Sequence, residues 1–226
     1  MSRIAKFSLV VIAPLLAILL ALLGVGTIRT NPLGWFLLLV GVAYAAGVVI
    51  VYYVRKEHFW ESSLSGATTQ EEHGDLSYWL ITAGMLVVFY LSPLEYLYFV
   101  AVLPRSNWMA ATGAGLVILG AALFVWARRT LHNNYSGHVS VKSGQSLVQS
   151  GPYRFIRHPA YAGYLLMAFG ISFGYSSLAG LAAIPVLLLP GLIYRMKVEE
   201  KLLTDHFGEA YRQYIRTAKR LIPGVW

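Results

Sequence analysis

A histidine followed by a proline, His158-Pro159, stands in the middle of the stretch that is best suited to chemistry. Proline disfavours a helical conformation at the preceding residue but fits the first turn of a helix, so a helix is predicted to begin here. The free backbone N–H groups at such a helix start can accept a carboxylate or a phosphate. Nearby, Tyr153 and Tyr161 offer ring faces to an aromatic or cationic ligand. A plainer interpretation fits the same residues: the neighbouring arginines anchor an interface and the proline only starts a helix.

Arg195 and Glu199 form a second candidate group. They are four residues apart, so on a helix they share a face. They directly follow a long apolar region, where a charged pair is costly and therefore often functional. An ordinary interfacial ion pair explains the spacing equally well.

The composition indicates that membrane helices position these residues. Of the 226 residues, 57% are hydrophobic and 12% are charged, which is about half the charged fraction of a soluble domain. A helix needs roughly 20 apolar residues to cross the hydrocarbon of a bilayer. Four stretches meet this requirement: residues 4–25, 33–54, 76–98 and 108–127. The first is longer than the apolar part of a secretory signal, and we expect it to be retained.

A fifth apolar region, residues 161–194, is too long for one crossing. Glycines, Pro185 and Pro190 interrupt it, and Ser176-Ser177 resembles a turn near its middle, so we expect a hairpin of two short helices. The sequence thus predicts an all-α fold: a polytopic integral membrane helical bundle with about six membrane segments.

The distribution of basic residues predicts the orientation of the chain. Six crossings place both termini on one side of the membrane. If that side is cytosolic, Arg29 and Arg105 are the two basic residues outside, and the other 16 of the 18 lie inside. We therefore expect a multi-pass protein with both termini in the cytosol. The net charge of +8 then reflects topology and attraction to the lipid bilayer. Nucleic-acid binding is not expected, because the basic residues are spread over several loops.

The tail from about Arg195 to Trp226 is polar enough to lie outside the hydrocarbon. Apolar residues recur in it at helical spacing, with charged residues between them. This pattern predicts a cytosolic, C-terminal amphipathic helix that lies on the membrane surface or caps the bundle. The recurring residues are Val198, Leu202, Leu203, Phe207, Tyr211, Tyr214 and Ile215.

Several other kinds of site are not expected. The chain has no cysteine, and its six histidines show no two-ligand spacing on one helix face, so no metal site is predicted. Glycine clusters at residues 24–26 and 113–120 lie inside apolar helices with no preceding strand. They predict close helix packing instead of a dinucleotide-binding loop. Glu95, beside Pro93 and two tyrosines, is interpreted as part of an outer interfacial belt.

Four segments resemble, in order, motifs of the isoprenylcysteine carboxyl methyltransferase and phospholipid methyltransferase superfamily. The family pattern runs Leu-Val-x-x-Gly-x-Tyr, then Arg-His-Pro-x-Tyr-x-Gly. It continues with Arg-x-x-x-Glu-Glu after a helical hairpin, and then Phe-Gly-x-x-Tyr-x-x-Tyr. In this chain the motifs occupy residues 147–153, 157–163, 195–200 and 207–214. The resemblance covers about half of the chain, and the N-terminal half matches only in being apolar.

The resemblance implies a methyltransferase that uses S-adenosyl-L-methionine as methyl donor and binds it without a Rossmann domain. It implies a division into N-terminal transmembrane helices, residues 1–106, and a methyltransferase core, residues 107–226. Arg195 and Glu199 would be the catalytic residues, and Arg195 would also bind the substrate. Carried over by motif, the cofactor-binding residues are Gln145, Ser146, Leu147, Val148, Tyr153, His158, Pro159, Ala160, Tyr161 and Glu199. Gln145 departs from some members, which have histidine there, and His138 aligns only loosely with the same pocket.

The methyl acceptor cannot be identified from the sequence. A lipidic or prenylated acceptor is expected, most closely the carboxylate of a prenylcysteine. A phospholipid amine, a small thiol and another membrane isoprenoid are the alternatives within the family. A sterol-reductase-like NADPH enzyme and a non-catalytic membrane protein are alternatives outside it. The sequence does not indicate an oligomeric state.

Overall fold

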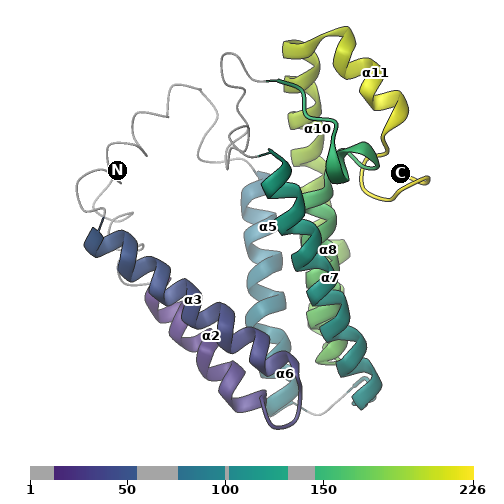
Figure 1. Cartoon of the computed structure of the whole chain (residues 1–226). Helices are drawn as coiled ribbons and strands as arrows, with labels where there is room; N and C mark the ends of the chain where they lie inside the picture. Colours follow the sequence, from purple (N-terminus) through teal and green to yellow (C-terminus); the bar gives the residue numbers. More distant parts are fainter. Residues whose placement is uncertain (1–12, 55–75, 100–101, 132–145) are drawn as a thin grey trace.

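The computed structural model of the protein describes residues 13–54, 76–99, 102–131 and 146–226. In these residues the regular structure is helical, with one isolated parallel bridge between Ile156 and Lys219 (Figure 1). The prediction of an all-α fold is therefore confirmed for this part of the chain. The elements are α2 (Ala13–Thr27), α3 (Leu33–Val54), α5 (Leu76–Leu86), η2 (Val87–Leu91), α6 (Ser92–Tyr98), α7 (Asn107–Leu131), η4 (Gly151–Arg154), α8 (Pro159–Gly174), α9 (Leu178–Ala183), η5 (Ile184–Leu188), α10 (Leu189–Phe207) and α11 (Glu209–Thr217).

Three described helical rods are long and apolar enough to cross a membrane, and α2 and α3 contribute shorter apolar stretches. The long rods span Trp79–Tyr98, Asn107–Leu131 and Leu178–Phe207. Large apolar side chains on their outer surfaces are exposed, among them Trp79, Ile118 and Val186. Such a surface is stable against lipid tails and unfavourable in water. The protein is an integral membrane protein.

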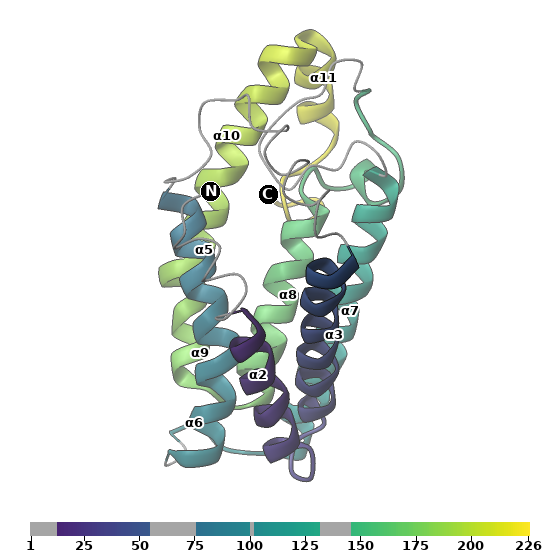
Figure 2. The same ribbon diagram turned by 90° about the vertical axis from the view of Figure 1, so that its left-hand side faces the viewer.

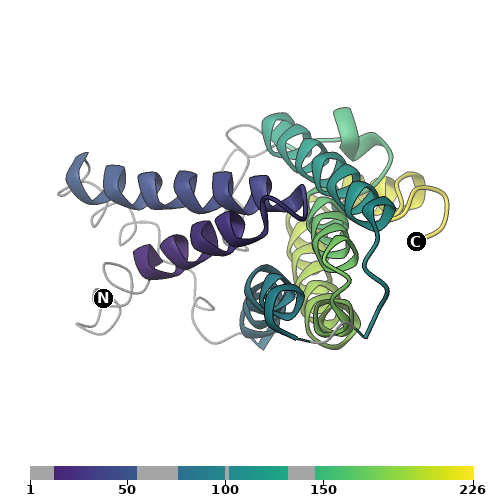
Figure 3. The same cartoon turned by 90° about the horizontal axis from the view of Figure 1, so that it is seen from below.

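Helices α2 and α3 form an antiparallel hairpin that lies beside the other helices (Figures 1 and 3). Asn31, in the connecting turn, accepts the backbone N–H of Leu33 at 3.0 Å and donates its amide to the Gly174 carbonyl at 2.7 Å. The Thr27 and Tyr175 hydroxyls lie 2.9 Å apart. One end of the hairpin is thus fastened to the turn that follows α8.

Within the described residues, the most extensive helix contact is between α7 and α8, and glycines make it possible. A Cβ atom added at Gly113 would lie 2.6 Å from the Gly174 Cα, and one at Gly120 would lie 2.7 Å from the Gly163 carbonyl oxygen. The predicted role of these glycines in close packing is therefore confirmed. Gly115 differs, because a Cβ there would meet nothing within 4 Å.

Two rods contain a π-helical turn, which the sequence did not predict. The first rod runs through α5, η2 and α6, and the second through α9, η5 and α10. In the second rod Pro185 lies inside the π-turn and Pro190 follows it. Proline lacks the N–H that an α-helical hydrogen bond needs, so a local change in helix geometry keeps the rod continuous. The two π-turns lie at neighbouring levels, since η2 packs on α9 and η5 packs on α5.

The tail differs from the predicted helix in two ways. First, the second arm of the hairpin does not end near Tyr194 but continues as α10 to Phe207, so this rod spans 30 residues (Figure 2). Second, the helix breaks at Gly208, which has a φ of 57°, a conformation that glycine adopts readily. Chain direction then changes and α11 begins. Its buried residues Tyr211 and Tyr214 pack with Leu203 and Phe207 of α10.

Glu95 lies at the end of the bundle that carries Asn31. Its carboxylate accepts the Ser177 hydroxyl at 2.6 Å and the backbone N–H groups of Leu178 and Ala179 at 3.1 and 3.2 Å. It therefore satisfies free donors at the start of α9. Arg105 lies 4.7 Å above the Tyr96 ring at the same end. These contacts agree with the interpretation of Glu95 as an interfacial residue with a structural role.

Candidate functional site

His158 is the residue at which α8 begins. Its backbone is non-helical, with φ −124° and ψ 59°, and Pro159 is the first helical residue. The predicted helix start is therefore confirmed. The His158 carbonyl accepts the N–H of Ala162 at 3.1 Å and closes the first turn. The N–H groups of Ala160 and Tyr161 belong to this first turn, where a helix has no internal acceptors for its donors.

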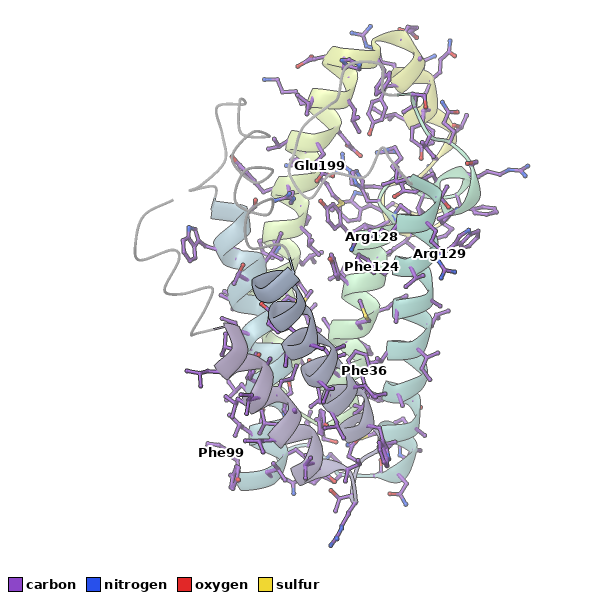
Figure 4. The ribbon with its side chains drawn as sticks, turned by 60° about the vertical axis from the view of Figure 1, so that its left-hand side comes forward. Phe36, Phe99, Phe124, Arg128, Arg129 and Glu199 are labelled. Atoms are coloured by element: carbon purple, nitrogen blue, oxygen red, sulfur yellow. The ribbon has the colours of Figure 1, made fainter. Side chains whose placement is uncertain are left out.

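The side chains of Tyr161, Arg195 and Glu199 meet between α8 and α10. The Tyr161 hydroxyl donates to Glu199 Oε1. Arg195 Nε lies 3.4 Å from the same carboxylate oxygen and donates to the Tyr161 hydroxyl at 3.2 Å. In Figure 4 Glu199 lies on α10 slightly above Arg128 and Arg129, which mark the end of α7. The predicted pairing of Arg195 with Glu199 is thus observed, and a tyrosine from another helix joins it.

The imidazole of His158 lies between two consecutive carboxylates. Its Nδ1 is 3.6 Å from Glu199 Oε2, and its Nε2 is 3.1 Å from Glu200 Oε1. The ring also stacks on Tyr161, with centroids 5.6 Å apart and planes inclined by 16°. His158 is buried, whereas 23% of the Glu199 side chain is exposed. Glu199 is therefore the carboxylate of this group that a ligand can reach.

Glu200 is the centre of a second, more buried network. Its Oε1 accepts from Arg157 Nε at 2.9 Å, and Arg220 donates through Nε to Oε1 and through Nη2 to Oε2. Arg157 also donates to the carbonyls of Ala218 and Ile215. A buried carboxylate is stable when such charged donors surround it. This network joins α10 to the start of α8 and to the chain after α11.

The segment after α11 runs parallel to the segment before α8. Arg157 N–H donates to the Lys219 carbonyl at 2.7 Å, and His158 N–H donates to the Arg220 carbonyl at 3.1 Å. The Tyr214 hydroxyl donates to the Tyr153 carbonyl at 2.6 Å. Burial raises the pKa of Tyr214 to about 12, so the hydroxyl keeps its proton at neutral pH. The backbone around His158 is therefore fixed from both sides.

The structure brings part of the predicted cofactor-binding set together. His158, Pro159, Ala160, Tyr161 and Glu199 lie at the junction of α8 and α10. The others lie further along the preceding segment. Leu147 packs against the cluster formed by Tyr211 and Tyr214. Tyr153 is buried, and its carbonyl accepts the Tyr214 hydroxyl. Ser146 and Val148 are the sequence neighbours of Leu147. Gln145 and His138 lie outside the described residues.

Sequence reasoning missed the roles of Glu200 and Arg220. Glu200 belongs to the Arg-x-x-x-Glu-Glu motif, so its position was noticed but not its partners. Arg220 lies 20 residues from Glu200 and is separated from it by the change of chain direction at Gly208. No spacing rule connects the two. Arg157 was interpreted as a possible interface anchor, but 7% of its side chain is exposed and it binds Glu200.

Comparison with known proteins finds similar membrane methyltransferases. A family model described as "Phospholipid methyltransferase" matches residues 108–210. Protein-S-isoprenylcysteine O-methyltransferase B of Arabidopsis thaliana is 26% identical over 183 residues, which cover 79% of this chain and 89% of that protein. Residues 108–210 thus match the phospholipid methyltransferase family, and isoprenylcysteine methyltransferases are similar to most of the chain. The family match includes the whole of α8 and of α10, and therefore both Arg195 and Glu199.

Two further comparisons point to the same group of proteins. The protein-S-isoprenylcysteine O-methyltransferase of Saccharomyces cerevisiae is 33% identical over 104 residues, covering 45% of this chain and 44% of that one. The solved structure of a eukaryotic intramembrane Ras methyltransferase, isoprenylcysteine carboxyl methyltransferase, matches with a TM-score of 0.53 and 21% identity. The match covers 85% of this chain and 66% of that chain, and at this identity it supports the fold. Together, the matching family model and the named relatives identify this protein as a membrane methyltransferase.

Proposed function

We propose that the protein transfers a methyl group from S-adenosyl-L-methionine to an acceptor that resides in the membrane. The observation that carries this proposal is the meeting of Glu199, Arg195, Tyr161 and His158 at the start of α8, inside the region that matches the family. The group combines a carboxylate that a ligand can reach, a guanidinium, two stacked rings and a helix start. These are the groups that a cation, an amino-acid carboxylate and an anionic acceptor require.

The residues present fit the cofactor by their chemistry. The negative charge of Glu199 attracts a sulfonium or an ammonium group, and the ring faces of Tyr161 and His158 also attract cations. The first N–H groups of α8, at Ala160 and Tyr161, suit a carboxylate. S-Adenosylmethionine, when bound, supplies an activated methyl group. The proposal includes five further cofactor-binding residues, of which Gln145 lies outside the described residues: Gln145, Ser146, Leu147, Val148 and Tyr153.

Arg195 is proposed to orient the acceptor. A guanidinium binds a carboxylate or a phosphate through parallel hydrogen bonds, and Tyr161 and Glu199 fix the direction in which this guanidinium points. Methyl transfer is a displacement in line with the breaking bond, so alignment of the acceptor supplies much of the rate. A carboxylate acceptor needs no general base.

The preferred acceptor is the carboxylate of a prenylcysteine. The relatives that cover most of this chain are named protein-S-isoprenylcysteine O-methyltransferases, and both Arabidopsis thaliana proteins match over more than three quarters of it. A phospholipid amine is the second candidate, which the description of the matching family model favours. An amine must lose a proton before or during transfer, and Glu199 would then accept it, either directly or through the Tyr161 hydroxyl that donates to it.

We further propose six membrane crossings with both termini in the cytosol. The turn after α2, the loop before α7 and the turn after α8 lie at one end of the bundle: Asn31 binds Gly174, and Ser176 donates to the Pro104 carbonyl. Arg29 and Arg105 belong to this end. The candidate site lies at the opposite end, which receives most of the basic residues and is therefore the cytosolic one.

Binding and turnover experiments test the proposal. Purified protein in detergent or nanodiscs is titrated by calorimetry with S-adenosylmethionine and, separately, with NADPH. We expect heat and thermal stabilisation with the first ligand only. Methyl transfer is then measured with a prenylcysteine analogue, a phospholipid amine and a small thiol. Stabilisation by NADPH alone would overturn the proposed function, and methylation of the amine alone would exchange the preferred acceptor for the second candidate.

A further inference from the structure

We infer that Arg220 is a positioning residue for cofactor binding and that it acts through Glu200 on His158. The inference rests on the proposed function and adds to it a residue from outside the four family motifs. Arg220 lies in the segment that follows α11, and no resemblance or spacing assigns it a role. Its partners connect it to the start of α8, where the cofactor is proposed to bind.

The contacts of Arg220 are directional. Its Nε lies 3.2 Å from Glu200 Oε1, and its Nη2 donates to Glu200 Oε2. This two-pronged geometry fixes the plane of the carboxylate, which a single point charge cannot do. The guanidinium also lies 5.5 Å from the centre of the Trp226 ring, so its other side is covered by an aromatic face.

The carboxylate held in this way fixes the imidazole of His158. Glu200 Oε1 lies 3.1 Å from His158 Nε2, whereas Nδ1 of the same ring faces Glu199. The ring cannot turn about its long axis without losing the contact with Glu200 and the stacking on Tyr161. Arg220 therefore acts on the imidazole that faces Glu199, the carboxylate proposed to bind the cofactor. The Arg220 side chain itself touches only Glu200 and Trp226 among the contacts described above.

The backbone adds a second connection between the same segments. The Arg220 carbonyl accepts the N–H of His158 at 3.1 Å, and the Lys219 N–H donates to the Phe155 carbonyl at 3.2 Å. These bonds do not depend on the Arg220 side chain. Arg157 also keeps its contacts with Glu200, Ala218 and Ile215 when that side chain is shortened. Loss of the guanidinium should therefore loosen the Glu200 carboxylate and His158 while the segments stay paired.

The test compares Arg220→Gln and Arg220→Lys with wild type, and uses Arg212→Gln as the matched control. Arg212 also lies in the C-terminal region and forms an ion pair, with Glu209 at 3.4 Å, but that pair is exposed. For each protein, the Kd for S-adenosylmethionine is measured by calorimetry, and the KM for it and kcat by methyl transfer. Thermal unfolding in the same detergent reports on folding.

We expect Arg220→Gln to raise both Kd and KM for the cofactor about tenfold, and to leave kcat at saturating cofactor within about twofold of wild type. Arg220→Lys keeps the charge but replaces the planar fork with a single ammonium nitrogen, so it should raise Kd by about threefold. Arg212→Gln should bind and react as wild type does. If Arg220→Gln does not fold, Arg220→Lys and Trp226→Leu, which removes the ring beneath the guanidinium, provide the same comparison.

Folded Arg220 variants with wild-type Kd and KM would overturn the inference. So would a loss of bound cofactor that only follows the unfolded fraction, because that result indicates a purely structural role. These outcomes differ from a failure of the proposed function, in which wild-type protein itself does not bind S-adenosylmethionine.

Discussion

Glu199 and Glu200 are neighbours in the sequence but contact different parts of the molecule. Successive side chains on an α-helix point about 100° apart, so the two carboxylates leave α10 in different directions. Glu199 contacts Tyr161 and Arg195, and Glu200 contacts Arg157 and Arg220. His158 joins the two groups, since each of its ring nitrogens faces one carboxylate. The exposed group is suited to ligands and the buried group to holding the backbone.

Substitution of Arg195 and Glu199 should separate acceptor handling from cofactor binding. Arg195→Lys keeps the charge but loses the planar fork, so we expect kcat to fall about 10- to 100-fold while the Kd for the cofactor stays near wild type. Glu199→Gln removes the negative charge that attracts the positively charged groups of the cofactor, so the Kd for the cofactor should rise by about 10-fold or more. Calorimetry and methyl transfer to a prenylcysteine analogue give the two numbers.

Arg212→Lys and Glu209→Gln are the controls for these two changes, because they alter an exposed pair on α11. Each should change stability by less than ~1 kcal/mol and leave turnover unaffected. If Arg195→Lys and Glu199→Gln behave like these controls, the pair is an ordinary interfacial ion pair and has no part in the reaction.

At this scale the sequence was informative where local rules apply. The spacing of Arg195 and Glu199 predicted their pairing, and the proline after His158 predicted the start of α8. Contacts across the chain were not predictable in the same way. Tyr161 meets Glu199 from 38 residues away, and Arg220 reaches Glu200 only because the chain changes direction after α10.

At the scale of the helices, the α7–α8 contact depends on positions where no side chain fits. We expect Gly113→Ala to lower the free energy of unfolding by about 2–4 kcal/mol, because the new methyl group would collide with the backbone of α8. Gly115→Ala is the matched control: it adds the same methyl group two residues further along α7, where space is open. It should be neutral, or stabilising by up to about 1 kcal/mol.

Unfolding of the two glycine variants in mixed micelles, followed by far-UV circular dichroism, measures this difference. Equal effects of the two alanines would show that helix propensity decides the outcome and that the contact with α8 does not.

Apolar length predicted the positions of the helical rods well, since the ranges 33–54 and 76–98 coincide with α3 and with the rod from α5 to α6. It did not predict where the last rod ends. Polar residues enter α10 at Arg195, and a change of composition looks the same whether a helix stops or continues beyond the membrane. The π-turns were also missed, because a proline in an apolar run indicates an interruption but not which helix geometry absorbs it.

For the whole molecule, the proposed topology predicts a simple labelling pattern. The chain has no cysteine, so single cysteines can be introduced without a background. Ser2→Cys and Val225→Cys should react with a membrane-impermeant maleimide only when the cytosolic side is accessible. Arg29→Cys should react from the outer side. Reaction of Ser2→Cys and Val225→Cys from opposite sides would contradict the six-crossing arrangement.

The length of the last rod has a consequence for how the reaction responds to its substrates. The rod of 30 residues is about 45 Å long, whereas the hydrocarbon of a bilayer is about 30 Å thick. Measured from Leu178, Arg195 lies about 26 Å and Glu199 about 32 Å along the rod, so the pair lies where α10 leaves the apolar layer. In the proposed topology, a water-soluble donor can arrive there from the cytosol while the proposed acceptor keeps its lipid chain in the bilayer. The rate should then follow the mole fraction of acceptor among the lipids. The test adds inert phospholipid while the acceptor concentration per volume of solution stays constant. Methyl transfer should then slow, because the acceptor becomes more dilute within the plane of the membrane.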